Sequence, residues 1–75
     1  MKLHYYRDTD SLYIELTDRD SADSREVADG IVLDFDVSGQ IVGIDIEHAS
    51  THVQLGRVVV AGMDDAELAA ERLTA

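Results

Sequence analysis

The sequence has no cysteine, no proline and no tryptophan. The lack of cysteine excludes disulfides and thiolate metal sites. A chain of 75 residues therefore has few ways to add stability, since a domain of this size buries only about 60% of the surface that its unfolded chain exposes. A metal held by histidine and carboxylates, or association with another chain, is what remains. We expect self-association in the form of a symmetric homodimer.

Basic residues are also scarce. Six Lys and Arg residues stand against 16 Asp and Glu residues, which gives a formal net charge of −10. This charge repels phosphate backbones and anionic lipids, so we expect neither nucleic acid nor membrane as a partner, whereas a basic protein partner fits it. No apolar run has the length of a transmembrane helix and no signal-peptide pattern opens the chain, so we expect a cytoplasmic protein.

Alternation of apolar and polar residues predicts a small antiparallel sheet. We expect strands at residues 2–6, 12–16 and 25–28, followed by a hairpin over residues 31–46 at the centre of the sheet. The first two strands should pair as a hairpin, because that pairing gathers their apolar side chains on one face. These side chains are Leu3, Tyr5, Leu12, Ile14 and Leu16.

The central hairpin allows two registers. In the first, Asp36 and Gly39 begin and end a type I turn that is followed by a bulge, and Phe35 opposes Ile41. In the second, the chain closes tightly around Ser38 and Gly39. We favour the second register, because the first mixes carboxylates with apolar side chains and burying an unpaired carboxylate costs several kcal/mol. The second register predicts the apolar pairs Phe35–Val42, Leu33–Ile44 and Ile31–Ile46, and leaves Asp34, Asp36 and Asp45 on the opposite face together with Val32 and Ile41.

The C-terminal part of the chain predicts one helix. Residues 47–55 suit a helical turn or an irregular link, and the valine-rich residues 57–60 suit a further strand. Residues 64–73 suit a helix, since Asp64 is a good N-cap and Glu67 completes a capping box.

The predicted fold class is α+β, a small antiparallel β-meander sheet of four to five strands with one C-terminal α-helix. We expect a single domain over residues 1–75, with the sheet in residues 1–62 and the helix in residues 63–73.

The acidic residues around the hairpin turn have the spacing of a calcium-binding loop. Asp34 and Asp36 alternate, Gly39 takes the sixth position and Asp45 the twelfth, as in an EF-hand loop. EF-hand loops lie between helices, however, and both flanks of this one have strand composition. Alternation of aspartates onto one solvated strand face explains the same spacing.

Two histidines offer a second candidate metal site. His48 and His52 are four residues apart, and on a helix this spacing places both imidazoles on one face, as divalent-metal sites require. Surface histidines near the end of an element are the simpler interpretation. The three tyrosines, Tyr5, Tyr6 and Tyr13, should lie near one edge of the sheet, as core rim or subunit interface.

Residues for catalysis are not apparent. The serines lie in polar loops without a nucleophile elbow, and there is no glycine-rich phosphate loop. We therefore expect no enzyme, no catalytic or cofactor-binding residue and no cofactor.

Several short motifs together resemble those of one family. They are Tyr5-Tyr6, Asp10-Ser11-Leu12-Tyr13-Ile14, Arg25-Glu26-Val27, Gly30-Ile31, Leu33-Asp34-Phe35-Asp36, Gly39, Ile41-Val42-Gly43-Ile44-Asp45-Ile46-Glu47 and Ala49-Ser50. With these motifs the chain is similar to a small, mostly prokaryotic family, the domain-of-unknown-function family 2283, over about residues 4–50. The resemblance implies a single small β-rich domain and assigns no catalytic residues. Some relatives are encoded beside small toxin-like proteins, which implies a neutralising role.

These observations together predict a non-catalytic protein-interaction module that forms a homodimer. One version of this prediction is an antitoxin-like protein that binds a basic partner. The alternative is a small metal- or ligand-binding protein that uses the candidate side chains Asp34, Asp36, Asp45, His48 and His52.

Overall fold

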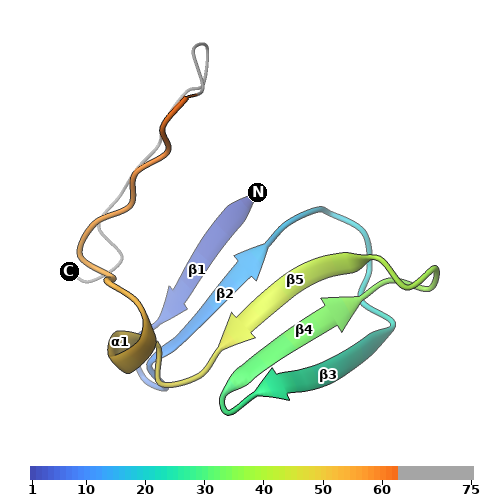
Figure 1. Ribbon diagram of the computed structural model, residues 1–75, viewed down its shortest axis with the longest axis horizontal. Coiled ribbons are helices and arrows are strands. Elements are labelled where there is room, and N and C mark those ends of the chain that lie inside the picture. Colours follow the sequence, from blue (N-terminus) through green and yellow to red (C-terminus); the bar gives the residue numbers. More distant parts are fainter. Residues whose placement is uncertain (63–75) are drawn as a thin grey trace.

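The protein is represented by a computed structural model (Figure 1), in which residues 1–62 are described. Five strands form one antiparallel sheet in the order β1-β2-β5-β4-β3, and a short helix follows. Among residues 1–62, no helix has the length and apolar character needed to cross a bilayer. The elements are β1 (Lys2–Tyr6), β2 (Ser11–Glu15), β3 (Asp23–Ala28), β4 (Ile31–Phe35), β5 (Ile41–Ile46) and α1 (Ala49–His52).

The predicted antiparallel α+β fold is confirmed. The strand order departs from a simple meander at one point, because β5 lies between β2 and β4. The valine-rich residues 57–60 do not form the predicted strand. The helix α1 lies within residues 47–55, which were expected to form a helical turn or an irregular link. The helix predicted for residues 63–73 lies outside the described residues.

The β1–β2 hairpin has the predicted pairing. Leu3 lies opposite Ile14 and Tyr5 lies opposite Leu12. Directly opposed residues of antiparallel strands point to the same face, so these four side chains share one face of the sheet. Leu12 is buried there with an exposed fraction of 3%.

The central hairpin combines features of both predicted registers. The Gly39 amide donates to the Asp36 carbonyl at 3.0 Å and the Asp36 amide donates to the Gln40 carbonyl at 2.8 Å. With Gly39 at φ 85°, this is the type I turn with a glycine bulge. Phe35 consequently opposes Ile41, and the predicted pairing of Phe35 with Val42 is wrong.

A second irregularity restores the favoured register beyond the turn. The register shifts between Asp34 and Phe35, and the pairs Leu33–Ile44 and Ile31–Ile46 then follow as predicted. An extra residue on one strand of an antiparallel pair produces this shift. The hairpin therefore obtains both a favourable turn and an apolar face.

A small core joins α1 to one end of the sheet. Its buried members are Leu12, Ile46, Ala49 and Leu55, and the partly buried Leu3, Tyr5, Ile14, Ile31, Ile44 and Val53 pack against them. Ala49 has no exposed surface and Leu55 is 5% exposed. The main hydrophobic cluster of the described chain thus lies at the end of the sheet where α1 is found.

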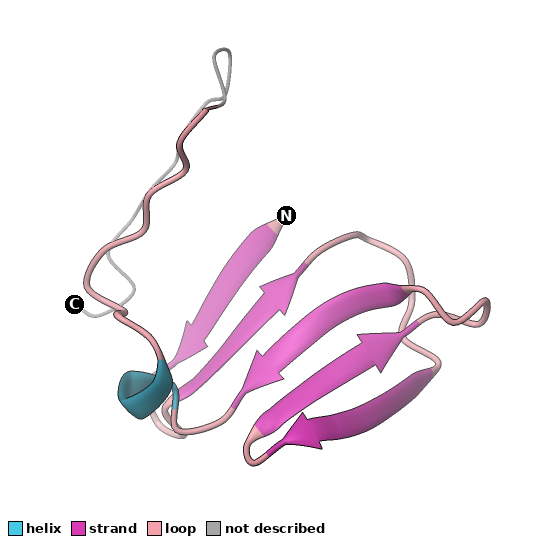
Figure 2. Ribbon diagram, in the orientation of Figure 1, coloured by secondary structure: helices cyan, strands magenta, loops and turns pink. Residues whose placement is uncertain are grey.

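The remainder of the sheet is a single layer. Figures 1 and 2 show the sheet face on, with α1 and the segment after it on the β1 side. Among residues 1–62, no helix or second sheet lies over β3 in Figure 2, and the cluster under α1 reaches β4 and β5 only through Ile31, Ile44 and Ile46. A sheet with an apolar face normally buries it against another layer, so the open face is the feature that a functional interpretation must explain.

Candidate functional site

The open part of the apolar face centres on β4. Leu33 and Phe35 are partly buried, yet neither belongs to the cluster under α1. On the neighbouring edge strand, Arg25 is opposite Leu33 and Asp23 is opposite Phe35. The Arg25 guanidinium carbon lies 4.4 Å from the centroid of the Phe35 ring, a cation–π distance. The open face is therefore an apolar strip with one acidic and one basic side chain along its β3 border.

The opposite face is acidic from β2 to β3, where its side chains form two rows across the strands, and on β1 these rows continue with His4 and Lys2. The first row contains Tyr13, Asp45, Val32 and Glu26, and the second contains Glu15, Gly43, Asp34 and Ser24. The prediction that Asp34 and Asp45 share the face opposite the apolar pairs agrees with this register. Val32 lies among the acidic side chains as predicted, and it is partly buried.

Tyr13 and Asp34 form the main hydrogen-bond network of the acidic face. The Tyr13 hydroxyl donates to Asp34 Oδ2 at 2.8 Å, and the Ser24 hydroxyl donates to Asp34 Oδ1 at 2.6 Å. Burial, together with the bond to Asp34, raises the pKa of Tyr13 to about 12, so the hydroxyl remains a protonated donor. This network spans β2 to β3 and uses both oxygens of a candidate calcium ligand.

Gly43 allows that network to form. A Cβ at this position would overlap the Tyr13 hydroxyl and lie 2.5 Å from Tyr13 Cζ, so the tyrosine ring lies on the bare backbone of β5. A glycine inside a strand pattern often marks such a close approach. A glycine between the apolar residues Val42 and Ile44 is the sequence signal that could have revealed this contact.

Asp36 organises the hairpin turn. Its Oδ1 accepts hydrogen bonds from the Ser38 amide at 2.9 Å, the Ser38 hydroxyl at 2.8 Å and the Gln40 amide at 2.9 Å. Arg19 Nε lies 3.0 Å from its Oδ2. The hydrogen bonds from Gln40 and Ser38, with a smaller effect of Arg19, lower the pKa of Asp36. This second candidate calcium ligand is therefore engaged in turn chemistry.

The lowered pKa of Asp36 predicts how stability responds to acid. A carboxylate with a depressed pKa stabilises the fold above its unfolded pKa, and this contribution is lost as pH falls through the folded value. Asp36→Asn should therefore be less stable than wild type at pH 7, and the difference should shrink as pH falls below 3.8, the ordinary pKa of an aspartate. The urea midpoints of wild type and variant at pH 7 and pH 3 measure this difference in stability. Asp20→Asn, a substitution at an exposed position, is the charge-matched control. A gap that stays constant over this range would contradict the role given to the Asp36 charge.

Asp10 is a second organising carboxylate, which the sequence analysis did not single out. It adopts a left-handed conformation with φ 52°. It accepts hydrogen bonds from the Tyr5 hydroxyl at 2.7 Å and the Ser50 hydroxyl at 2.6 Å, and its carbonyl accepts the Ala49 amide at 2.8 Å. The bonds from Ser50 and Tyr5 lower the pKa of Asp10. Asp10 thus fixes α1 to the β1–β2 turn.

The candidate metal ligands are not assembled into one site. α1 comprises only Ala49–His52, and His48 precedes it with φ 50° and ψ 46°. The two histidines therefore do not have the helical spacing on which their pairing depends. Within residues 1–62, no group of three or more His, Asp or Glu side chains is placed to hold a metal ion. The alternative of metal or ligand binding remains a prediction from the sequence.

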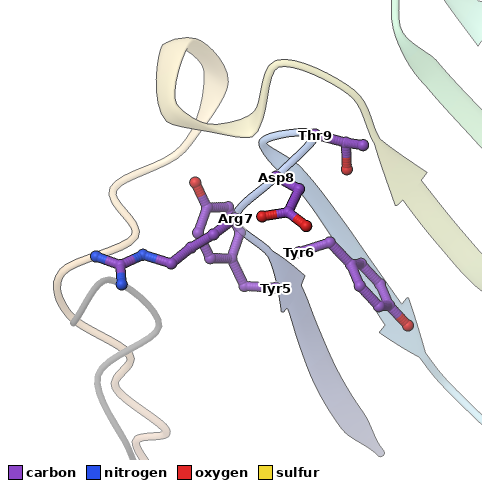
Figure 3. A pocket seen from close by; sticks show the side chains of 5 residues that line it. All are labelled: Tyr5, Tyr6, Arg7, Asp8 and Thr9. Atoms are coloured by element: carbon purple, nitrogen blue, oxygen red, sulfur yellow. The ribbon is translucent and has the colours of Figure 1, made fainter.

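One open hollow lies at the β1–β2 turn (Figure 3), with a volume of about 420 Å³. Its lining consists of consecutive residues from the end of β1 and the turn that follows, and the two tyrosine side chains point to different sides of it (Figure 3). All three tyrosines lie on β1 and β2 at one edge of the sheet, as predicted. Tyr5 faces the core, whereas Tyr6 and Tyr13 lie on the acidic face. The lining residues are Tyr5, Tyr6, Arg7, Asp8 and Thr9.

Comparison with known proteins identifies a family. A family model described as "Protein of unknown function (DUF2283)" matches residues 2–50, which contain all five strands. No curated protein and no solved structure matched the chain.

Proposed function

The chain belongs to the DUF2283 family of proteins of unknown function, and from this premise we propose that it is a non-catalytic protein-interaction module that works as a homodimer. The observation that supports the proposal is the single-layer sheet with an open apolar face around Leu33 and Phe35. Removing apolar surface from water contributes a stabilising free energy of roughly 25 cal/mol per Å² buried. A second protein layer would therefore stabilise the domain as well as bind it.

The chemistry of the polar groups supports a non-catalytic role. Asp36 and Asp10 have lowered pKa values because each carboxylate accepts several hydrogen bonds. These bonds hold a turn and a helix in place. The raised pKa of Tyr13 keeps its hydroxyl protonated at neutral pH and makes it a weaker acid than an ordinary tyrosine. Each of these perturbed groups therefore has a structural explanation that requires no substrate.

The oligomeric state tests the proposal directly. Size-exclusion chromatography with light scattering should give twice the chain mass of 8.3 kDa at high concentration, with dissociation towards the single-chain mass on dilution. A constant mass of one chain up to millimolar concentration would contradict the homodimer.

A narrower form of the proposal is an antitoxin-like role in which a basic protein binds the acidic face. The rows around Tyr13 and Asp34 provide a negative surface on the side opposite Leu33, so both faces can be occupied together. Co-expression with a basic product of an adjacent gene tests this form. The complex should survive low salt and dissociate at high salt, because screening weakens contacts between exposed charges. Absence of a complex at low salt would contradict it.

A further inference from the structure

We infer that the open apolar face binds a second copy of this chain, sheet on sheet, about a two-fold axis that crosses the strands at the level of Ser24 and Asp34. The inference rests on the proposed function and adds the surface and the orientation of the two copies. It follows from the arrangement of four side chains on β3 and β4.

These four side chains form a square on one face. Asp23 is paired with Phe35 and Arg25 is paired with Leu33, and paired residues of antiparallel strands share a face. The contact between the Arg25 guanidinium and the Phe35 ring shows that this face is the same for both pairs. Ser24 and Asp34 lie between the two pairs and point to the acidic side.

A two-fold axis at this level makes the square complementary to itself. The axis lies between the two sheets and runs perpendicular to the strands. A half-turn about it places the Asp23–Phe35 pair of one copy over the Arg25–Leu33 pair of the other. Asp23 of one copy then meets Arg25 of the other, and Phe35 meets Leu33. In such an isologous contact every pairing occurs twice, so the interface gains two apolar contacts and two opposite-charge contacts.

The charges of the border explain why the occupant is a second copy. In the chain itself, Arg25 Nε lies 3.7 Å from Asp23 Oδ2, and the two side chains are 66% and 65% exposed. Both are therefore available to a facing surface. The β3 border carries one acidic and one basic side chain, Asp23 and Arg25. A second copy in the opposite strand direction places its own base against the acid and its own acid against the base. A uniformly basic partner would instead be repelled by Arg25.

The charge distribution over the two faces also permits the dimer in spite of the net charge of −10. Asp34, Asp45 and Glu26 lie on the acidic face, which points outward when the apolar faces meet. Packed sheets are about 10 Å apart, and exposed charges separated by more than about 8 Å are largely screened at physiological salt.

The position of the chain after α1 agrees with this occupant. The described segment that follows α1 runs out on the β1 side of the sheet (Figure 1). β3 and β4, which carry the square, lie at the other side of the sheet. The described segment after α1 therefore does not cover the square.

Charge reversal tests the orientation. Asp23→Arg places two positive side chains at each charged contact, and Arg25→Asp places two negative ones there. Each variant alone should dimerise at least tenfold more weakly than wild type. An equimolar mixture of the two variants should form heterodimers with affinity close to wild type, because every charged contact is again between opposite charges. Native mass spectrometry distinguishes the three dimers.

Matched controls separate this inference from the proposed function. Asp8→Arg and Lys2→Asp make the same charge changes at exposed positions on and beside β1, at the opposite edge of the sheet from β3, and should leave dimerisation unchanged. If wild type is a dimer but neither single reversal weakens it, or the mixture gives no preferred heterodimer, the orientation is overturned while the homodimer stands. If wild type is monomeric at all concentrations, both fail. Far-UV circular dichroism on each variant confirms that the fold is retained, and both reversed side chains are largely exposed.

Discussion

Replacing Gly43 with alanine should lower the free energy of unfolding by about 2–3 kcal/mol, which is large for a domain of this size. The backbone at Gly43 is not in the left-handed region, so alanine is compatible with its conformation. The cost arises from the added Cβ, which would overlap the hydroxyl end of Tyr13. The ring must then leave its place and lose the hydrogen bond to Asp34. Urea denaturation of wild type and variant measures the difference.

A double-mutant cycle identifies the cause of this effect. In a Tyr13→Val background the ring is absent, so Gly43→Ala should cost close to nothing. In a Tyr13→Phe background the ring remains while the hydrogen bond is lost, so most of the cost should persist. Residues in direct contact show coupling energies of about 0.5–3 kcal/mol in such cycles. Equal costs in all three backgrounds would mean that the contact with Tyr13 is not what requires glycine.

Leu33→Glu should convert the dimer to a monomer, with an increase in Kd of at least about 100-fold, or about 2.7 kcal/mol. Leu33 lies on the open face, away from the cluster that packs under α1. A carboxylate there would be buried against the Phe35 ring of the second copy, which costs several kcal/mol. Arg25, which lies opposite position 33, is already paired with Asp23 of the second copy in the inferred dimer. Light scattering over a concentration series measures the change.

Val37→Glu is the matched control. It makes the same chemical change at a turn residue that is 94% exposed, and it should dimerise like wild type. Circular dichroism must show that Leu33→Glu keeps its strands, since Leu33 is partly buried. A folded Leu33→Glu variant that still dimerises with wild-type affinity would contradict the role of this face.

The sequence predicted the pairing within the β1–β2 and β4–β5 hairpins well, because burial of apolar faces constrains register strongly. The pairs Leu33–Ile44 and Ile31–Ile46 illustrate this. The sequence did not predict that β5 pairs with β2, where a meander would place β3. The error at Phe35 arose because the two registers were treated as exclusive. A bulge of one residue satisfies both the turn and the face, and the alternation of apolar residues contains no direct signal for it.

The functional residues were harder to predict, because their roles depend on contacts between distant parts of the chain. Asp10 contacts Ser50 across 40 residues, and Asp34 contacts Tyr13 across 21 residues. A sequence spacing such as that of Asp34, Asp36 and Asp45 says which carboxylates are near in the chain. It does not say that one of them holds a turn and another a tyrosine. The prediction of a partner, by contrast, followed from the length of the chain and its lack of cysteine alone.

An isotope-filtered nuclear Overhauser spectrum of mixed labelled and unlabelled protein tests the central claim most directly. The chain contains a single phenylalanine, so signals from the Phe35 ring are unambiguous. The account predicts contacts between the Phe35 ring of one copy and the Leu33 methyl groups of the other. A dimer whose intermolecular contacts omit both residues, or a sample without intermolecular contacts at millimolar concentration, would contradict it.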